Sequence, residues 1–176
     1  MAASARVLYE QGVERATIAD IARAADVPVG NVYYYFKTKD ELVEGALREI
    51  AKQLGVMTGR LDELPDPRER LRGLIGVWID QRDIMARYGC PVTNIAVEID
   101  KRDVGGPSLA VRGVIQQLLD WAELQYRQMG VSDPAGRALA LIGAYQGVTV
   151  ISNSLRDPDL IAREAARLLR ELDALT

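Results

Sequence analysis

Histidine is absent from the 176-residue sequence, and cysteine occurs once, as Cys90. Without histidine the chain cannot form a histidine–cysteine metal site, nor the Ser–His and Cys–His pairs that activate common hydrolytic nucleophiles. A single cysteine cannot make a disulfide within the chain, which fits a reducing compartment such as the cytoplasm. We therefore predict a cytoplasmic protein that is not an enzyme and that holds neither a metal nor a cofactor.

Long apolar runs are also lacking. Stretches such as Ala138–Ile142 fall far short of the roughly 18 apolar residues that a membrane-spanning helix needs. No basic start followed by an apolar segment marks an export signal. The net charge is −3, and the first 47 residues carry five basic and seven acidic side chains, so no excess of positive charge indicates a nucleic-acid partner. Any such role must depend on where particular side chains lie.

What is present is helical periodicity along nearly the whole chain, without a persistent strand pattern. It predicts an all-α protein of about nine helices, with a three-helix head and a larger helical body. Short helices are expected over residues 2–10, 18–24 and 29–35. Longer ones are expected over about 38–57, 68–87, 92–101, from a loop at Val104–Pro107 to Met129, 135–154 and 159–175. Because short helices are unstable alone, the first three must pack on one another and on the fourth.

Local signals predict a helix-turn-helix in the head, with Asp26-Val27 as its turn. Thr17 followed by Asp20 has the pattern of an N-terminal capping box. The second helix of the pair opens with Gly30 and Asn31, which are small or polar. Such residues leave room for a close approach to the major groove of DNA, where recognition helices read bases with their N-terminal residues.

The segment from Ala16 to Leu42, ATIADIARAADVPVGNVYYYFKTKDEL, resembles the signature of the TetR family nearly position for position. The resemblance implies a DNA-binding domain in residues 1–45 and an effector-binding and dimerisation domain in residues 46–176. It implies a homodimeric repressor, which binds a palindromic operator in double-stranded DNA and is released by a small-molecule effector. The residues that would contact DNA are Thr17, Val29, Gly30, Asn31, Tyr33, Tyr35 and Lys39.

Among these residues, Asn31 is the best candidate for a base contact, because an amide can pair bidentately with adenine. Thr17, Tyr35 and Lys39 would hold phosphates, which position a protein on DNA without reading its sequence. Packing alone is the alternative for the three consecutive tyrosines. At helical spacing, however, at least one of them must be exposed.

The body carries a weaker resemblance around Cys90. Tyr88-Gly-Cys-Pro-Val-Thr-Asn-Ile-Ala-Val-Glu98 is similar to a segment of one branch of TetR regulators, some of which sense electrophiles through the cysteine. A helix N-terminus at Cys90 would favour its reactive thiolate. Two alternatives stay open, since a lone cysteine beside glycine and proline also suits a small buried hydrophobe or the wall of a ligand pocket.

Five residues lie on helices that resemble the pocket-forming helices of the family: Trp78, Met85, Asn94, Trp121 and Tyr145. Aromatic rings with an occasional polar group suit a small, apolar effector, although each residue could equally be plain core. The last two predicted helices suit dimerisation. The first of them is apolar on more than one face, which predicts burial nearly all round.

Two other functions remain to be weighed. A helical enzyme is disfavoured, since histidine and a glycine-rich phosphate loop are both missing. A helical interaction module with impaired DNA binding is suggested by the acidic balance of the head. It is also suggested by the position of the first helix, since members of the family usually carry a further, often basic, segment before it.

Overall fold

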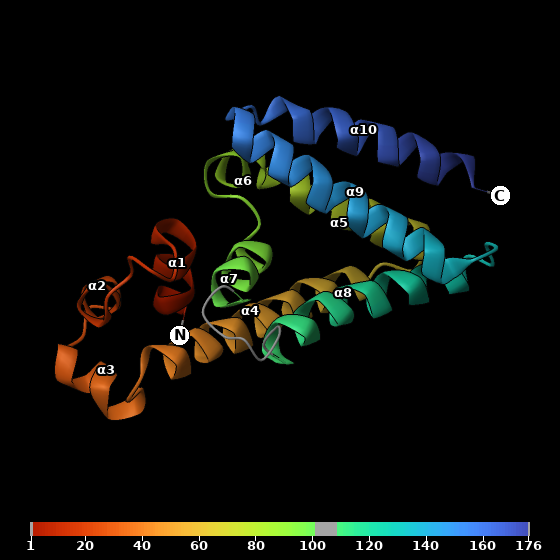
Figure 1. Ribbon diagram of the computed structural model, residues 1–176. Helices are drawn as coiled ribbons and strands as arrows, with labels where there is room; N and C mark the ends of the chain where they lie inside the picture. The colour runs from red at the N-terminus through yellow and green to blue at the C-terminus, as the bar shows by residue number, and fades with distance from the viewer. Residues whose placement is uncertain (1, 101–108, 176) are drawn as a thin grey trace. The chain divides into compact units, whose positions relative to one another are not determined.

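The computed structural model describes residues 2–100 and 109–175, and its regular elements there are all helices (Figure 1). Over these ranges the helices are α1 (Ala2–Gln11), α2 (Ile18–Ala24), α3 (Val29–Tyr35), α4 (Lys39–Asp62), α5 (Pro67–Asp80), α6 (Arg82–Tyr88), α7 (Pro91–Asp100), α8 (Leu109–Gln128), α9 (Pro134–Leu155) and α10 (Asp159–Ala174). The all-α prediction is confirmed. The loop predicted at Val104–Pro107 lies outside the described residues.

One predicted helix, over residues 68–87, is two helices in the structure. The chain breaks at Gln81 (φ −95°, ψ 3°), whose N–H turns back to the carbonyls of Val77 and Ile79. The Arg82 guanidinium also donates to the Ile79 carbonyl, at 3.0 Å. Neither glycine nor proline marks this position, so the sequence carries no local signal of the break. The second of the two helices, α6, packs on α9, which is distant from it in sequence.

The chain forms two compact units. Unit 1 comprises Met1–Gln53 and Pro91–Ile115, and unit 2 comprises Leu54–Cys90 and Gln116–Thr176. Helices α4 and α8 therefore contribute residues to both units, whereas α7 belongs wholly to unit 1 and begins at its boundary.

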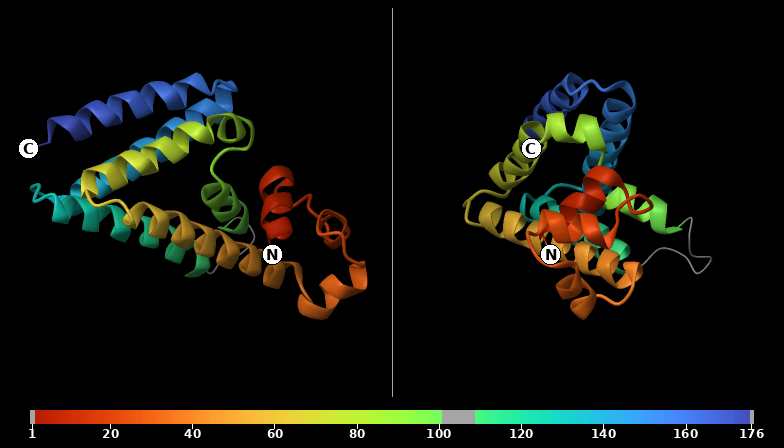
Figure 2. Two further views of the ribbon diagram at one scale, coloured as in Figure 1. Left: turned by 180° about the vertical axis from the view of Figure 1, so that it is seen from behind. Right: turned by 90° about the vertical axis from the view of Figure 1, so that its left-hand side faces the viewer.

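Within unit 1 the three short helices pack in sequence, α1 on α2 and α2 on α3, and α1 also contacts α7 (Figure 2). Local chemistry sets the ends of these helices. Thr17 and Asp20 form a reciprocal capping box at the start of α2. Asp26 turns the chain after α2 with φ +53°, a left-handed conformation that aspartate tolerates better than most residues. The buried core of the unit includes Leu8, Val13, Ile21, Val32, Leu42 and Leu47.

Unit 2 packs α10 along α5 and α9 around one apolar core (Figures 1 and 2). Two of its helices begin with an aspartate cap and a proline in the first turn. Asp66 accepts from the Arg68 N–H, and Asp133 accepts from the Gly136 N–H. At both helix starts, an aspartate followed by proline in the sequence marks the boundary.

Helix α9 is buried on one side only. Its buried residues are Ala138, Leu141, Ile142, Tyr145, Thr149 and Ser152. On the other side Leu139, Val150, Ile151 and Leu155 are each more than half exposed. The prediction of burial nearly all round is therefore wrong for the single chain, because α6 and α10 pack against one side of the helix.

By length and composition, α9 is also the one helix within the described ranges that could cross a membrane. This is weak evidence for a membrane span, because a helix that packs in a protein core passes the same test. A third of the apolar window of α9 is buried inside unit 2.

Candidate functional site

Helices α2 and α3 form the predicted helix-turn-helix. At the entry to α2, the Thr17 hydroxyl accepts from the Asp20 N–H at 3.1 Å and donates to Asp20 Oδ2 at 2.5 Å. The Thr17 N–H also donates to this carboxylate, at 3.1 Å. The bond from the Thr17 side chain, with that from its backbone, lowers the pKa of Asp20. At the exit, Val27 N–H returns to the carbonyl of Ala22 at 3.0 Å, which closes the turn.

Helix α3 presents almost its whole surface to solvent. Val32 is its single buried residue. The five positions predicted to face DNA on this helix, Val29, Gly30, Asn31, Tyr33 and Tyr35, are all exposed. A Cβ added at Gly30 would meet no atom within 4 Å, so the front of the helix is open. The helix contains no charged residue, so its polar groups are an amide, phenols and the backbone.

Tyr34 is an exposed residue of α3 that was not among the predicted DNA contacts. It is 74% exposed, compared with 50% for Tyr33 and 73% for Tyr35. Its ring lies edge-on to Tyr35 at a centroid distance of 5.2 Å, and the Lys37 ammonium lies 5.6 Å from its centroid. Three consecutive tyrosines directly after the single buried valine are the sequence signal from which the exposure of Tyr34 could have been predicted.

Lys39, the first residue of α4, donates from Nζ to the carbonyl of Glu14 at 2.8 Å. An ammonium group has three donors, so this bond leaves two for another partner such as a phosphate. Thr17 differs, since its hydroxyl and its N–H both donate to Asp20. The structure thus gives Thr17 a capping role, whereas Lys39 retains capacity for a phosphate.

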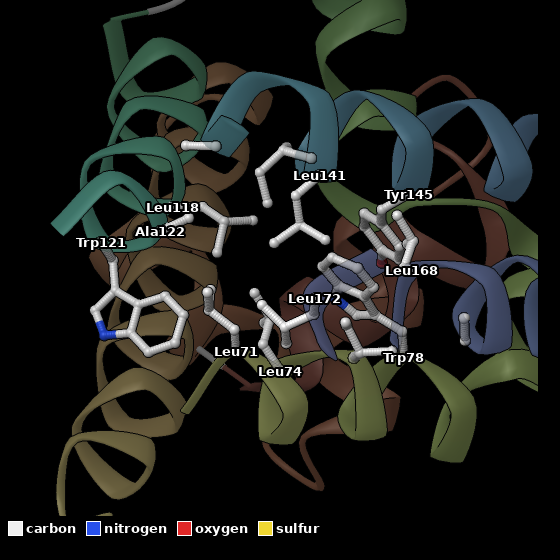
Figure 3. Close-up of a cluster of buried hydrophobic side chains, with 14 of the residues drawn as sticks. Leu71, Leu74, Trp78, Leu118, Trp121, Ala122, Leu141, Tyr145, Leu168 and Leu172 are labelled. Atoms are coloured by element: carbon white, nitrogen blue, oxygen red, sulfur yellow. The ribbon is translucent and has the colours of Figure 1, made fainter. Parts of the chain in front are cut away.

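Four of the five predicted pocket residues lie in one buried apolar cluster of unit 2 (Figure 3). Trp78 and Tyr145 stack with centroids 4.2 Å apart and ring planes 17° apart. The Tyr145 hydroxyl donates to Met85 Sδ at 3.0 Å. Trp121 lies at the other end of the cluster on α8, where its Nε1–H donates to Asp62 at 2.9 Å. The fifth residue, Asn94, is on α7 in unit 1.

Cys90 is buried, with 6% of its surface exposed, and it directly precedes α7. The Gln146 side-chain amide donates to Cys90 Sγ at 3.6 Å. Before Cys90, the end of α6 is capped by α9: Asn153 donates to the Ala86 carbonyl, and Arg156 donates to the carbonyls of Ala86 and Arg87. Sequence reasoning missed this cap, because its partners are about 70 positions apart and show no local pattern.

Metal-binding side chains do not gather in the described part of the chain. Across residues 2–100 and 109–175, no three histidine, cysteine, aspartate or glutamate side chains lie close enough to hold an ion. The described structure does provide an exposed helix, α3, in unit 1 and a buried apolar cluster in unit 2.

The first part of the chain is similar to known regulatory proteins. Residues 1–46 match the profile described as "Bacterial regulatory proteins, tetR family". A curated relative, the HTH-type transcriptional regulator BetI of Klebsiella pneumoniae (strain 342), is 40% identical over 80 residues. That match covers 44% of this chain and 41% of the relative, so the chain spans less than half of the length of the curated protein.

Solved structures extend the likeness in fold along the chain. The regulatory protein TetR from Rhodobacter sphaeroides has a TM-score of 0.80 at 21% identity, over 96% of this chain and 94% of that one. A TetR transcriptional regulator from Chloroflexus aurantiacus has a TM-score of 0.81 at 19% identity, over 98% and 91%. Residues 1–46 are therefore similar to the N-terminal region of the tetR family of bacterial regulatory proteins, and the chain shares its fold with these solved regulators.

Proposed function

We propose that the protein is a DNA-binding transcriptional regulator, a repressor that a small-molecule effector releases from a palindromic operator. The observation that carries the proposal is the exposed face of α3, where Val29, Gly30, Asn31, Tyr33 and Tyr35 all lie on the surface. Residues 1–45 form the DNA-binding domain, and residues 46–176 bind the effector and dimerise. This role needs neither catalysis nor a cofactor, and its place is the cytoplasm.

The chemistry of α3 suits base recognition. The Asn31 side-chain amide reads adenine through paired hydrogen bonds in the major groove. Val29 and Gly30 allow close approach, and Tyr33 adds a phenol. Phosphate contacts come from the Tyr35 hydroxyl and from the free donors of Lys39.

A homodimer follows from the uncovered face of α9. Leu139, at 63% exposed, Val150, Ile151 and Leu155 form an apolar strip along this helix. Helix α10 differs, because its exposed positions are mainly charged, such as Arg163 and Arg170. Burial of the α9 strip against a second copy stabilises a two-fold dimer, and two recognition helices then match a palindromic operator.

The effector is small, uncharged and mainly apolar. This proposal is supported by the cluster around Trp78, Met85 and Tyr145, which consists of apolar and aromatic side chains without a charged member. An effector that prefers one arrangement of these helices shifts the population of the regulator away from its DNA-bound form. In this proposal Cys90, which accepts from the Gln146 amide, is a buried residue in the wall of the effector pocket. The alternative is that its thiol senses electrophiles, and Cys90→Ser tests this alternative.

The first experiment measures binding of the purified protein to its own upstream intergenic DNA and to a scrambled duplex, by fluorescence anisotropy across a salt series. We expect a saturable preference for the native DNA that weakens steeply with salt. Asn31→Ala with Tyr33→Ala removes the preference, since a bidentate base contact alone contributes about 1–3 kcal/mol. Arg163→Ala on α10 is the matched control and leaves binding unchanged.

Equal, weak binding to both duplexes, in this chain and in an upstream-extended chain, contradicts the regulator proposal. It favours the helical interaction module with impaired DNA binding, which the acidic balance of the first 47 residues also suggests. Repeating the measurement with an upstream-extended chain separates a missing basic segment from a lost function, because only the former restores the preference.

The dimer and the effector have separate tests. Ile151→Glu on α9 yields a monomer in light scattering, whereas Ala166→Glu on the exposed face of α10 leaves the dimer intact. The sequence has two tryptophans, Trp78 and Trp121, and both lie in the apolar cluster. Trp121→Phe therefore isolates the Trp78 emission, which reports neutral aromatic compounds that also release the DNA.

A further inference from the structure

The turn between α1 and α2 is held from a distant helix. Glu98, near the end of α7, accepts the Glu14 N–H on Oε2 at 3.0 Å, across 84 positions of sequence. Both groups belong to unit 1, in which α7 packs against α1. A charge-assisted bond to a backbone N–H is among the stronger hydrogen bonds in proteins. Glu98 therefore ties α7 to the segment that leads into the helix-turn-helix.

Glu14 is held through its carbonyl as well as through its N–H. The Glu14 carbonyl accepts from Lys39 Nζ at 2.8 Å. An acid from α7 and a base from the start of α4 thus bind the N–H and the carbonyl of one residue. We name this arrangement, formed by Glu98, Glu14 and Lys39, the Glu14 clamp.

Gly12 makes the clamp possible. Its φ of +82° is a conformation that a residue with a side chain rarely adopts, and its N–H ends α1 by returning to the Leu8 carbonyl at 2.9 Å. A Cβ at this position would lie 2.8 Å from Glu98 Oε1. The glycine therefore provides both the turn and the space for the carboxylate.

The covalent chain links the clamp to unit 2. Helix α7 begins at Pro91, directly after Cys90, and runs without interruption to Asp100. The residues before it are held from α9, through Gln146 on Cys90 and Arg156 on the end of α6. A single helix thus follows a segment fixed by α9 and carries Glu98 near its far end.

We propose that Glu98 is a positioning residue, which fixes the DNA-reading helices on α7 through the Glu14 backbone and transmits movement of α7 to them. This inference rests on the proposed DNA-binding function. Glu98 itself does not contact DNA. It acts through the α1–α2 turn. Movement of α7 would reach the DNA-reading helices through this turn, in addition to movement of α4, which follows α3 directly in the chain.

The test uses the full chain with Glu98→Ala and Glu98→Gln, and Val97→Ala as the exposed neighbour on the same helix. Amide hydrogen exchange is followed at Glu14 by NMR. We expect exchange about ten-fold faster or more in Glu98→Ala, because the bond that protects the amide is lost. Glu98→Gln retains most of the protection, since its amide oxygen still accepts. Val97→Ala matches the wild type.

Affinity for the upstream DNA is measured on the same proteins. We expect Glu98→Ala to bind several-fold more weakly with an unchanged slope of log K against log salt, because no phosphate contact is removed. Glu98→Gln restores most of the affinity. Tighter binding of Glu98→Ala would mean that the carboxylate lies close enough to the phosphates to repel them, and it would overturn the positioning role.

Two further outcomes refute separate parts of the inference. Equal Glu14 exchange in the wild type and Glu98→Ala overturns the clamp. Faster exchange with unchanged DNA affinity overturns its link to DNA reading. If the wild type shows no preference for its upstream DNA while Glu14 exchange responds as expected, the regulator function fails and the clamp stands.

Discussion

Thr17→Ala separates two roles that one side chain can have. The hydroxyl caps α2 by accepting from the Asp20 N–H at 3.1 Å, and loss of such a cap costs about 1 kcal/mol of stability. For a chain of this size that corresponds to a fall in Tm of roughly 2–4 °C. Thermal unfolding followed by circular dichroism measures it. Thr17→Ser keeps the capping oxygen and serves as the control.

The family resemblance also gives Thr17 a phosphate contact, which the same variant tests. In the free protein both donors of Thr17 bind the Asp20 carboxylate, so we expect Thr17→Ala and Thr17→Ser to bind DNA with nearly the same affinity once both are folded. Loss of a phosphate contact would instead weaken binding of Thr17→Ala to native and scrambled DNA alike, because such a contact carries no sequence information. A Thr17→Ala variant that keeps the wild-type Tm and binds both duplexes more weakly would refute the capping argument.

Two more predictions concern the stability of the two units. The pKa of Asp20 is lowered chiefly by its bond with the Thr17 side chain, so Asp20 stabilises the fold above its ordinary pKa, and this contribution is lost as pH falls through the lower, folded value. The difference in urea midpoint between wild type and Asp20→Asn should shrink from pH 6 to below about pH 4, and a constant difference would contradict this cause. Trp78→Ala removes a buried ring stacked on Tyr145 and should cost about 3–5 kcal/mol in urea unfolding. The exposed Leu124→Ala on α8 should change stability by less than about 0.5 kcal/mol, and equal costs would mean that the apolar cluster is not the core of unit 2.

The head could be predicted from the sequence because its signals are local. The Thr17–Asp20 box, the left-handed Asp26 and the small residues at the front of α3 all act within a few positions of one another. The same holds for the aspartate–proline starts of α5 and α9. Exposure of most of α3 also follows, since a seven-residue helix that is anchored by Val32 can bury little else.

The missed features depend on partners distant in sequence. Nothing near Gln81 breaks a helix, and the cap of α6 is supplied by Arg156, 70 positions away. Glu98 reads in the sequence as one more polar residue near a helix end, and its partner is a backbone N–H without a side-chain signature. Tertiary packing decides such contacts, so periodicity and capping patterns cannot predict them.

A double-mutant cycle between Gly12 and Glu98 measures the clamp as a free energy. Gly12→Ala costs about 1–2 kcal/mol from its left-handed backbone alone, since φ is +82°. In the wild type a further cost arises, because the new Cβ would lie 2.8 Å from Glu98 Oε1 and displaces the carboxylate from the Glu14 N–H. In Glu98→Ala this second cost is absent. Urea unfolding should therefore show the double variant more stable than the sum of the two single changes predicts, by about 0.5 kcal/mol or more. Strictly additive costs would mean that Glu98 does not bind this turn in solution.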